Sequence, residues 1–210
     1  MTGRVLLFNR GFWFLIIPFF VCGFTTTGLM DTHLIPFAQH CGFSVSTTSA
    51  AVSLLAVFNT AGTLVAGILA DRWNNSRLLA IIYLVRAFTL AFLVIMTSNH
   101  GLMSIFLEHS WLLVLFSISF GLVDFSVVAP TLKLLSSYFP TGAIGMVTGL
   151  LYMSHQLGSA LGSYLPGILF DKTNSYQISF EISFILLIIA SIVSVCFPKI
   201  QEYKQLSRVS

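Results

Sequence analysis

Six long apolar stretches dominate this sequence, and they limit the chain to folds that a lipid bilayer can accommodate. The stretches fall at about residues 11–31, 46–70, 77–97, 110–133, 143–169 and 176–197. Each has close to the ~20 apolar residues that a helix needs to cross the hydrocarbon core. Membrane-spanning strands would be about ten residues long and would alternate apolar with polar positions. The sequence therefore predicts an all-α membrane protein with six transmembrane helices in residues 1–198 and a polar cytoplasmic tail at residues 199–210.

The composition excludes several other classes of protein. Hydrophobic residues make up 56% of the 210 residues and charged residues only 8%, whereas a soluble domain is about a quarter charged. The ten basic residues are scattered without a run of five, so the net charge of +3 does not indicate nucleic-acid binding. The first apolar stretch is too long for a signal peptide and no Ala-x-Ala site follows it, so we expect it to be retained. The three cysteines are expected to be free thiols.

The distribution of basic residues predicts the orientation of the chain, because cytoplasmic loops of membrane proteins collect Lys and Arg. If the N-terminus is cytoplasmic, one side of the membrane receives Arg4, Arg10, Arg72, Arg77, Lys133, Lys199, Lys204 and Arg208. The other side receives Lys172 together with Asp31, His33, His40, His100, Glu108 and His109. We therefore expect a multi-pass inner-membrane protein with both termini in the cytoplasm.

A charged turn lies between the second and third stretches, with the sequence Gly67-Ile-Leu-Ala-Asp-Arg-Trp-Asn-Asn-Ser-Arg77. A small residue allows close packing there, and an acid and a base can interact with helix ends. The turn resembles the cytoplasmic signature G-x-L-A-D-R-x-G-R-R of the major facilitator superfamily, which occupies the same place. Asn74 replaces the second glycine and is expected to tolerate a left-handed backbone. The weaker basic ending is common in the C-terminal half of that family. The resemblance assigns a cytoplasmic gating motif to Gly67, Asp71, Arg72 and Arg77.

The fifth stretch is rich in small residues at intervals of four. Such spacing forms a groove that lets another helix backbone approach closely in lipid. The helix-packing candidates are Gly145, Gly149, Gly158 and Gly162. Two parts of the sequence resemble the eleventh helix and the next loop of the oxalate/formate and monocarboxylate-like branch of the family, namely residues 149–167 and 171–176. The same branch is resembled by residues 28–36 and 130–145. The resemblance implies helices seven to twelve of a transporter for a small organic solute. A small carboxylate is the first expectation, with drug or metabolite efflux as the alternative.

Two charged side chains, Arg86 and Asp124, are expected near the middle of the third and fourth spans. Charge inside the membrane is expensive, so such residues need a partner or a function. One interpretation is a buried ion pair that locks the two helices together. The other makes Asp124 a proton or substrate site, with Arg86 as its counter-ion or as an anion ligand. The family resemblance favours Asp124 as the residue that faces the solute.

Other polar residues complete the expected substrate and ion pathway. His155 either relays protons or is satisfied by Gln156 or a main-chain carbonyl. Asn59 either binds solute or bridges helices. Asp31 and His33 lie between Gly28 and Pro36, where we expect the first helix to be interrupted near its outer end, as in many transporter sites. They form either an outer vestibule or an ordinary loop.

The sequence contains no pattern that indicates an enzyme, a metal site or a cofactor. It has no G-x-S-x-G, H-E-x-x-H, P-loop or dinucleotide-binding motif. Ser154 and His155 are adjacent on a helix and point apart, and the histidines lack metal-ligand spacing. Alternating access needs two repeats around one site. We therefore expect the chain to pair with a separately encoded half or with a second copy of itself. The alternatives are an inactive remnant, or a membrane subunit without transport of its own.

Overall fold

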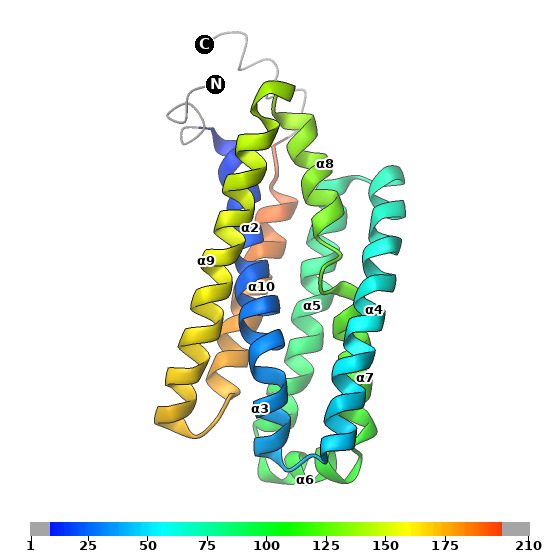
Figure 1. The fold of residues 1–210 in the computed structure, drawn as a ribbon, viewed down its shortest axis with the longest axis vertical. Coiled ribbons are helices and arrows are strands. Elements are labelled where there is room, and N and C mark those ends of the chain that lie inside the picture. The colour runs from blue at the N-terminus through cyan, green and yellow to red at the C-terminus, as the bar shows by residue number, and fades with distance from the viewer. Residues whose placement is uncertain (1–8, 199–210) are drawn as a thin grey trace.

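The computed structural model describes residues 9–198, and the secondary structure of this part is helical (Figure 1). The first helical stretch comprises α2 (Arg10–Gly23), the π-helix η1 (Phe24–Met30) and α3 (Asp31–Cys41). It is followed by α4 (Val45–Arg72), α5 (Asn75–Thr97), the short α6 (His100–Glu108), α7 (Trp111–Val123), α8 (Val128–Tyr138), α9 (Thr141–Thr173) and α10 (Gln177–Val195). The expected basic residues Arg4, Lys199, Lys204 and Arg208 and the tail at residues 199–210 lie outside the described residues.

Within residues 9–198, five helical stretches are long and apolar enough to cross a membrane. They are Arg10–Cys41, Val45–Arg72, Asn75–Thr97, Trp111–Tyr138 and Gln177–Val195. With 33 residues α9 is also long enough, but it is not among these five because glycine, serine and other polar residues interrupt its apolar sequence. The fifth expected span, at residues 143–169, therefore stays a prediction.

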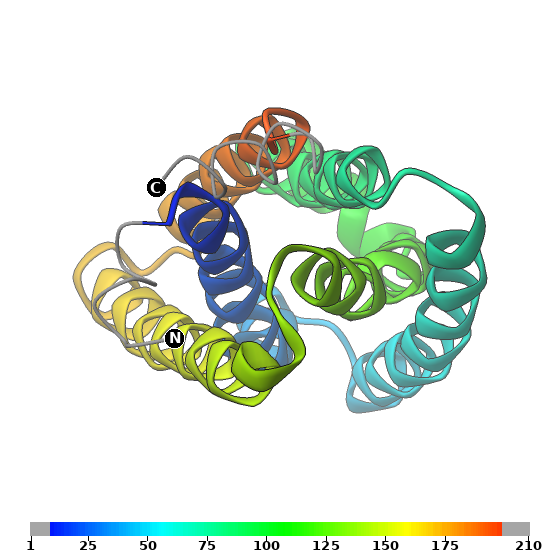
Figure 2. The ribbon, with the colours of Figure 1, turned by 90° about the horizontal axis from the view of Figure 1, so that it is seen from above.

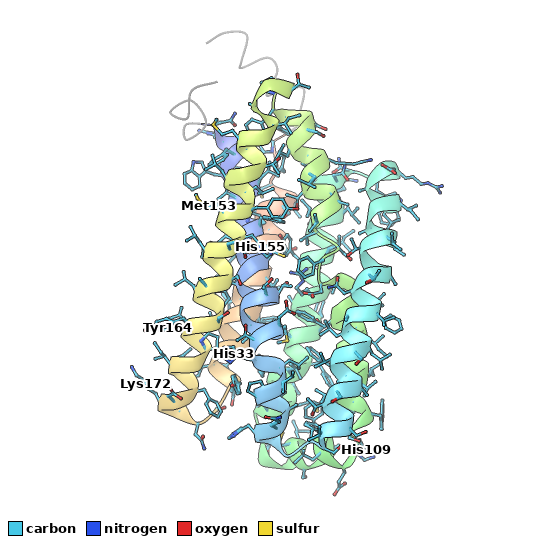
Figure 3. The ribbon with its side chains drawn as sticks, viewed as in Figure 1. His33, His109, Met153, His155, Tyr164 and Lys172 are labelled. Atoms are coloured by element: carbon cyan, nitrogen blue, oxygen red, sulfur yellow. The ribbon has the colours of Figure 1, made fainter. Side chains whose placement is uncertain are left out.

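The long helices run side by side between two ends of the molecule (Figure 1). The start of α2, the α4–α5 turn, the α8–α9 turn and the end of α10 lie at one end. The α3–α4 loop, α6 and the α9–α10 loop lie at the other. Seen from above, α9 and α4 lie at opposite edges with α8 between them (Figure 2). Arg10, Arg72 and Arg77 therefore share one end with the α8–α9 turn, while Lys172 lies at the opposite end (Figure 3).

The first helix differs from the sequence prediction, because it continues past residue 31 to Cys41 without a break. Its hydrogen-bond pattern changes from α to π at Phe24–Met30 and then returns to α. Threonine hydroxyls support this change: Thr25 donates to the Val21 carbonyl (2.9 Å) and Thr32 to the Thr27 carbonyl (3.1 Å). Side-chain donors of this kind let a helix change register inside lipid, where water is absent. Asp31 and His33 are therefore helical residues rather than loop residues.

The π-helix and α2 pack against α9 through glycines on both sides. A Cβ atom at Gly158 would lie 2.1 Å from the Phe20 carbonyl oxygen, and one at Gly162 would lie 2.2 Å from that of Phe24. On the facing helix, a Cβ atom at Gly23 would lie 1.9 Å from the His155 carbonyl oxygen. By contrast, a Cβ atom at Gly145 or Gly149 would meet nothing within 4 Å. Two of the four expected packing glycines are thus in backbone contact, and two lie on an open face of α9.

A second close backbone contact joins α4 to α7. A Cβ atom at Gly62 would lie 2.0 Å from the Leu122 carbonyl oxygen, and one at Gly121 would lie 2.5 Å from that of Leu55. In lipid, where no hydrophobic effect drives helices together, small residues of this kind permit van der Waals packing of the backbones. The contact fixes α7 against the middle of α4.

The glycine contacts predict a difference between two alanine substitutions on the same helix. Gly158→Ala places a methyl group against the Phe20 carbonyl and should destabilise the protein by about 1–3 kcal/mol. Gly145→Ala meets open space and should change the stability by no more than about 0.5 kcal/mol. Unfolding of the purified chain in mild detergent by added denaturing detergent measures both. Equal stability of the two variants would contradict the packing of α2 on α9.

Candidate functional site

The fourth apolar stretch is broken at its middle, between α7 and α8. Residues 124–127 are not helical, and the N–H of Val128 bonds the Phe125 carbonyl (3.1 Å) instead of the Asp124 carbonyl. Pro130 explains the break, because it has no N–H for the Ser126 carbonyl and its ring crowds that carbonyl. The sequence analysis predicted a continuous fourth span and an interruption in the first. The structure places the interruption in the fourth span.

Arg86 of α5 donates hydrogen bonds to the carbonyls that the break exposes. Its Nη2 atom donates to the main-chain carbonyls of Val123 (2.5 Å) and Asp124. Its Nη1 atom donates to Thr26 Oγ1 (3.1 Å) and to Cys22 Sγ (3.4 Å). The guanidinium carbon also lies 5.6 Å from the centre of the Tyr83 ring. The Arg86 side chain has a relative exposure of 0%.

The position of Arg86 is electrostatically favourable. Val123 is the last residue of α7, and Asp124 follows it as the C-cap. The carbonyls at a helix C-terminus carry partial negative charge, so a cation at this place is stabilised by the helix dipole as well as by hydrogen bonds. Arg86 therefore caps the C-terminus of α7, and this cap replaces the donors that the next helical turn would supply.

The expected ion pair between Arg86 and Asp124 is not formed. Within residues 9–198, the carboxylate of Asp124 makes no ion pair with the guanidinium, which holds the main-chain carbonyl of that residue instead. The guanidinium is fully buried, and both of its terminal nitrogens have protein acceptors, while its Nε atom has no hydrogen-bond partner among the described residues. The structure therefore adds no support for a carboxylate as the solute, and the role of Arg86 as an anion ligand stays a prediction.

Asn59 of α4 bridges to the broken segment with both ends of its amide group. Its Nδ2 atom donates to Asp124 Oδ2 (3.4 Å), and its Oδ1 atom accepts from the main-chain N–H of Phe125 (3.3 Å). Through these contacts Asn59 joins α4 to the segment between α7 and α8. Of the two roles that the sequence allowed, solute binding and bridging of helices, the contacts correspond to the second. The side chain is half-buried.

His155 of α9 approaches the break from the other side. Its buried ring lies 5.0 Å from that of Phe19 and 6.3 Å from that of Phe125. Gln156 beside it is exposed, and Asp31 is exposed on the face of the first helix. Asp31 is close enough to interact electrostatically with both His155 and Asp124. His155 therefore lies beside the broken segment (Figure 3).

His33 lies apart from these residues, nearer to the α9–α10 end (Figure 3). Its Nε2 atom donates to the Ser163 carbonyl (2.8 Å), so Nδ1 accepts from the Tyr176 hydroxyl (3.4 Å). Burial, and to a smaller extent Asp171, raise the pKa of Tyr176, so this phenol keeps its proton and can donate. His33 thus ties α3 to α9 and to the start of α10. It is not brought together with Asp124.

The charged turn between α4 and α5 is connected to the middle of α8, the second half of the broken span. Asp71 pairs with Lys133 of α8, while Arg72 and Arg77 are exposed. A Cβ atom at Gly67 would meet nothing within 4 Å. Asn74 is not left-handed, as its φ of −68° shows; it caps α5 by accepting from the Arg77 N–H (3.1 Å). The expected role for Asn74 is therefore wrong, because a helix begins directly after it and needs an N-cap.

The residues around the break lie at one depth. Arg86 is at the midpoint of Asn75–Thr97, Asp124 at that of Trp111–Tyr138, and Asn59 at that of Val45–Arg72. Thr26 lies halfway along Arg10–Cys41. We call Cys22, Thr26, Asn59, Arg86 and Asp124 the midplane cluster. Polar groups at a broken helix in the middle of the bilayer are typical of transporter sites for solutes and coupling ions.

The sequence analysis missed two members of the midplane cluster, Cys22 and Thr26. The signal that could have found Thr26 is the run of three threonines at residues 25–27 within an apolar stretch. The break itself was signalled by Pro130, which follows Asp124 by less than two helical turns.

The bridging role of Asn59 leads to a stability prediction. Asn59→Leu removes the donor to Asp124 and the acceptor for the Phe125 N–H, which leaves buried polar groups unpaired and should destabilise the chain by about 1–3 kcal/mol. Thr60→Val is the control, since Thr60 is exposed and its hydroxyl bonds the Ala56 carbonyl of its own helix. Detergent unfolding should separate the variants, and an Asn59→Leu chain as stable as Thr60→Val would argue against the bridge.

Comparison with known proteins finds similarity to a membrane transporter. No family model matches the chain. Over 195 residues, which cover 88% of this chain, the sequence is 28% identical to an uncharacterized MFS-type transporter, YcxA, of Bacillus subtilis (strain 168). The chain spans about half of that relative's length, namely 46%. Together with the five apolar helices, this similarity supports a multi-pass membrane protein that resembles MFS-type transporters.

Proposed function

We propose that the chain is one six-helix half of a secondary active transporter of the major facilitator superfamily and that it moves a small organic solute by alternating access. The observation that carries this proposal is the midplane cluster, in which buried charged side chains surround a broken helix at mid-depth. Soluble or purely structural helix bundles have no need for such a costly arrangement, whereas transporters place their sites there. The similarity to an MFS-type transporter along most of the chain supports the same conclusion.

We propose that α9 is the fifth span, the one that is missing from the five apolar helices. Its 33 residues would extend over about 50 Å, which exceeds the thickness of the hydrocarbon core. It runs the height of the molecule beside α2 (Figure 1). Its small and polar residues lower its hydropathy, and several of them, including Gly145, Gly149 and Gln156, face outward. In a membrane, such a face is better suited to another protein or to a solute pathway than to lipid.

We propose that a second six-helix half completes the pathway. Among the five apolar spans, α4 buries the smallest share of its apolar window, and α9 keeps an open small-residue face at the opposite edge. The coverage of 46% of the similar transporter fits a single repeat. The partner is either a separately encoded half or a second copy of this chain. The remaining surface contacts the lipid bilayer. A membrane subunit that does not transport is the alternative function, because a single repeat cannot alternate access by itself.

We propose a small organic metabolite or a drug as the solute. The expectation of a carboxylate rested on the family branch and on Arg86, and Arg86 is engaged by the protein itself. The side chains that remain for a solute are the half-buried Asn59, the exposed Gln156 and Asp31, and Asp124 behind Asn59.

The charge distribution predicts the orientation of the chain. Arg10, Arg72 and Arg77 lie at the end that we place in the cytoplasm, and Lys172 at the outer end. In a Cys196→Ser background, Lys172→Cys in intact cells should react with a membrane-impermeant maleimide. Ser136→Cys, near the α8–α9 turn, should react only after the cells are made permeable. The reverse pattern would contradict the assignment of inner-membrane insertion with both termini in the cytoplasm.

The proposed transport can be tested with purified chain in proteoliposomes. Labelled carboxylates, amino acids, sugars and cationic drugs are offered under imposed ion gradients, and solute binding is followed in parallel by thermal shift. We expect at least one class to be taken up or bound, with at least a ~10-fold loss in Asp124→Asn because this residue belongs to the midplane cluster. Asp171→Asn, in the exposed end of α9, should behave as wild type.

The outcomes separate the candidate functions. Uptake by this chain alone supports a transporting pair of identical halves. Binding that depends on Asp124 without uptake supports a half that requires a different partner. Neither uptake nor binding of any class contradicts a transport function and favours the non-transporting subunit.

A further inference from the structure

A groove lies between α5 and α7, and none of the residues of the midplane cluster lines it. Its volume is about 310 Å³. Its walls are formed mainly by Val85, Phe88 and Thr89 of α5 and by Leu115, Phe116 and Ser119 of α7. Because neither α4 nor α9 contributes a lining side chain, the groove does not coincide with the two edges at which we place the second half.

The two hydroxyl groups in the groove are already used by their own helices. Thr89 Oγ1 donates to the Arg86 carbonyl (2.7 Å). Ser119 Oγ donates to the Leu115 carbonyl (2.8 Å). The other lining side chains are hydrocarbon. An occupant therefore needs no polar atom inside the groove, and a polar group placed there would lose its hydration without gaining a partner.

The depth of the groove matches one leaflet of the bilayer. Leu115 and Ser119 lie about 6 and 12 Å along the helix axis from Trp111, the first residue of α7. On α5, Phe88 lies about 14 Å before the last residue, Thr97. Half of the hydrocarbon core is about 15 Å thick. The groove therefore extends from near the membrane surface on the α6 side almost to mid-depth, which is the region that the acyl chains of one leaflet fill.

The end of the groove near the membrane surface has a feature of the headgroup region. Trp111 lies on the same face of α7 as Leu115, because residues four apart are neighbours on a helix, and 58% of its surface is exposed. Exposed tryptophans are typical of the level of the lipid headgroups. On the α5 side, Phe92 also lines the groove, and its ring lies 5.9 Å from that of Phe106 in α6, which lies across this end of the molecule (Figure 1). An occupant would therefore leave the groove on the α7 side, beside Trp111.

The walls of the groove disfavour a second protein helix as the occupant. Helices associate closely in lipid where small residues let their backbones approach, as Gly62 and Gly121 do between α4 and α7. In the groove the most exposed lining side chains are large, namely Phe88 with 64% and Leu115 with 47% of the surface exposed. Such side chains keep another backbone at a distance, whereas a thin and flexible hydrocarbon chain fits between them.

We propose that the groove between α5 and α7 binds one acyl chain of a phospholipid from the leaflet on the α6 side, with the headgroup beside Trp111. The bound chain fills the space between the two helices and so supports their packing next to the Arg86 cap. The inference goes beyond the proposed function, since it requires insertion into a bilayer and not transport.

Native mass spectrometry of the purified, delipidated chain tests this binding. Added palmitoyl-oleoyl phosphatidylglycerol should return as one tightly held lipid per chain. Glycerophosphoglycerol, the same headgroup without acyl chains, should form no adduct. Ser119→Phe places a ring in the groove and should lower the bound fraction at least ~10-fold at a fixed lipid concentration. The matched control is Ile185→Phe on α10, where 56% of the side chain surface is exposed outside the groove; it should bind lipid as wild type does.

A second variant keeps the test decisive if Ser119→Phe does not fold. Leu115→Ala shortens one wall of the groove, and because Leu115 is exposed the truncation should leave the fold intact, which size-exclusion chromatography checks. This variant should also hold the lipid more weakly than wild type. Ile185→Ala, an equal truncation on α10, should not.

Photocrosslinking in nanodiscs locates the bound chain. A phospholipid with a photoactivatable group in the middle of one acyl chain should label peptides that contain Phe88 or Leu115 more strongly than those of α10, and Ser119→Phe should abolish the excess. The inference is overturned if the label is spread evenly over α5, α7 and α10. It is also overturned if the groove variants hold lipid as well as the α10 variants do, or if the groove mediates association of two copies of the chain that Ser119→Phe disrupts.

Discussion

The hydrogen bonds from Arg86 to the carbonyls of Val123 and Asp124 make a broken helix possible inside the bilayer. In water, solvent would pair with carbonyls that lose their helical donors. In hydrocarbon each unpaired group costs several kcal/mol. A buried guanidinium is itself unfavourable, and it is stabilised here by the negative end of α7, by Thr26 and Cys22, and by the Tyr83 ring. The guanidinium therefore offsets the cost of the unpaired carbonyls at the break, and these carbonyls offset the cost of burying the guanidinium.

Glycine contacts bring the other helices to this place. The approach of α9 to α2 depends on Gly23 and Gly158, and that of α4 to α7 depends on Gly62 and Gly121. These contacts put His155 beside Phe125 and Asn59 beside Asp124. The small residues thus determine which side chains surround the break as well as how tightly the helices pack.

The broken span also connects the midplane cluster to the charged turn. One end of α8 follows directly from Asp124, and Lys133 further along pairs with Asp71 at the end of α4. A movement of α8 at the break would therefore change the contact between Lys133 and Asp71, in the turn that resembles a gating motif. This arrangement gives a physical basis for the proposed alternating access, since a hinge at mid-depth lets one half-helix move while the other stays fixed.

The sequence by itself determined that residues 9–198 are helical, that five of the six predicted stretches are apolar enough for lipid, and that Arg86 and Asp124 lie near the middle of two of them. Lipid imposes these features through composition and position along the chain. Only the tertiary structure decided that Arg86 holds main-chain carbonyls rather than the Asp124 carboxylate, that the fourth span is broken instead of the first, and that His33 lies elsewhere. The reason is that sequence position gives the depth of a residue, whereas its hydrogen-bond partner depends on the approach of helices far apart in the chain.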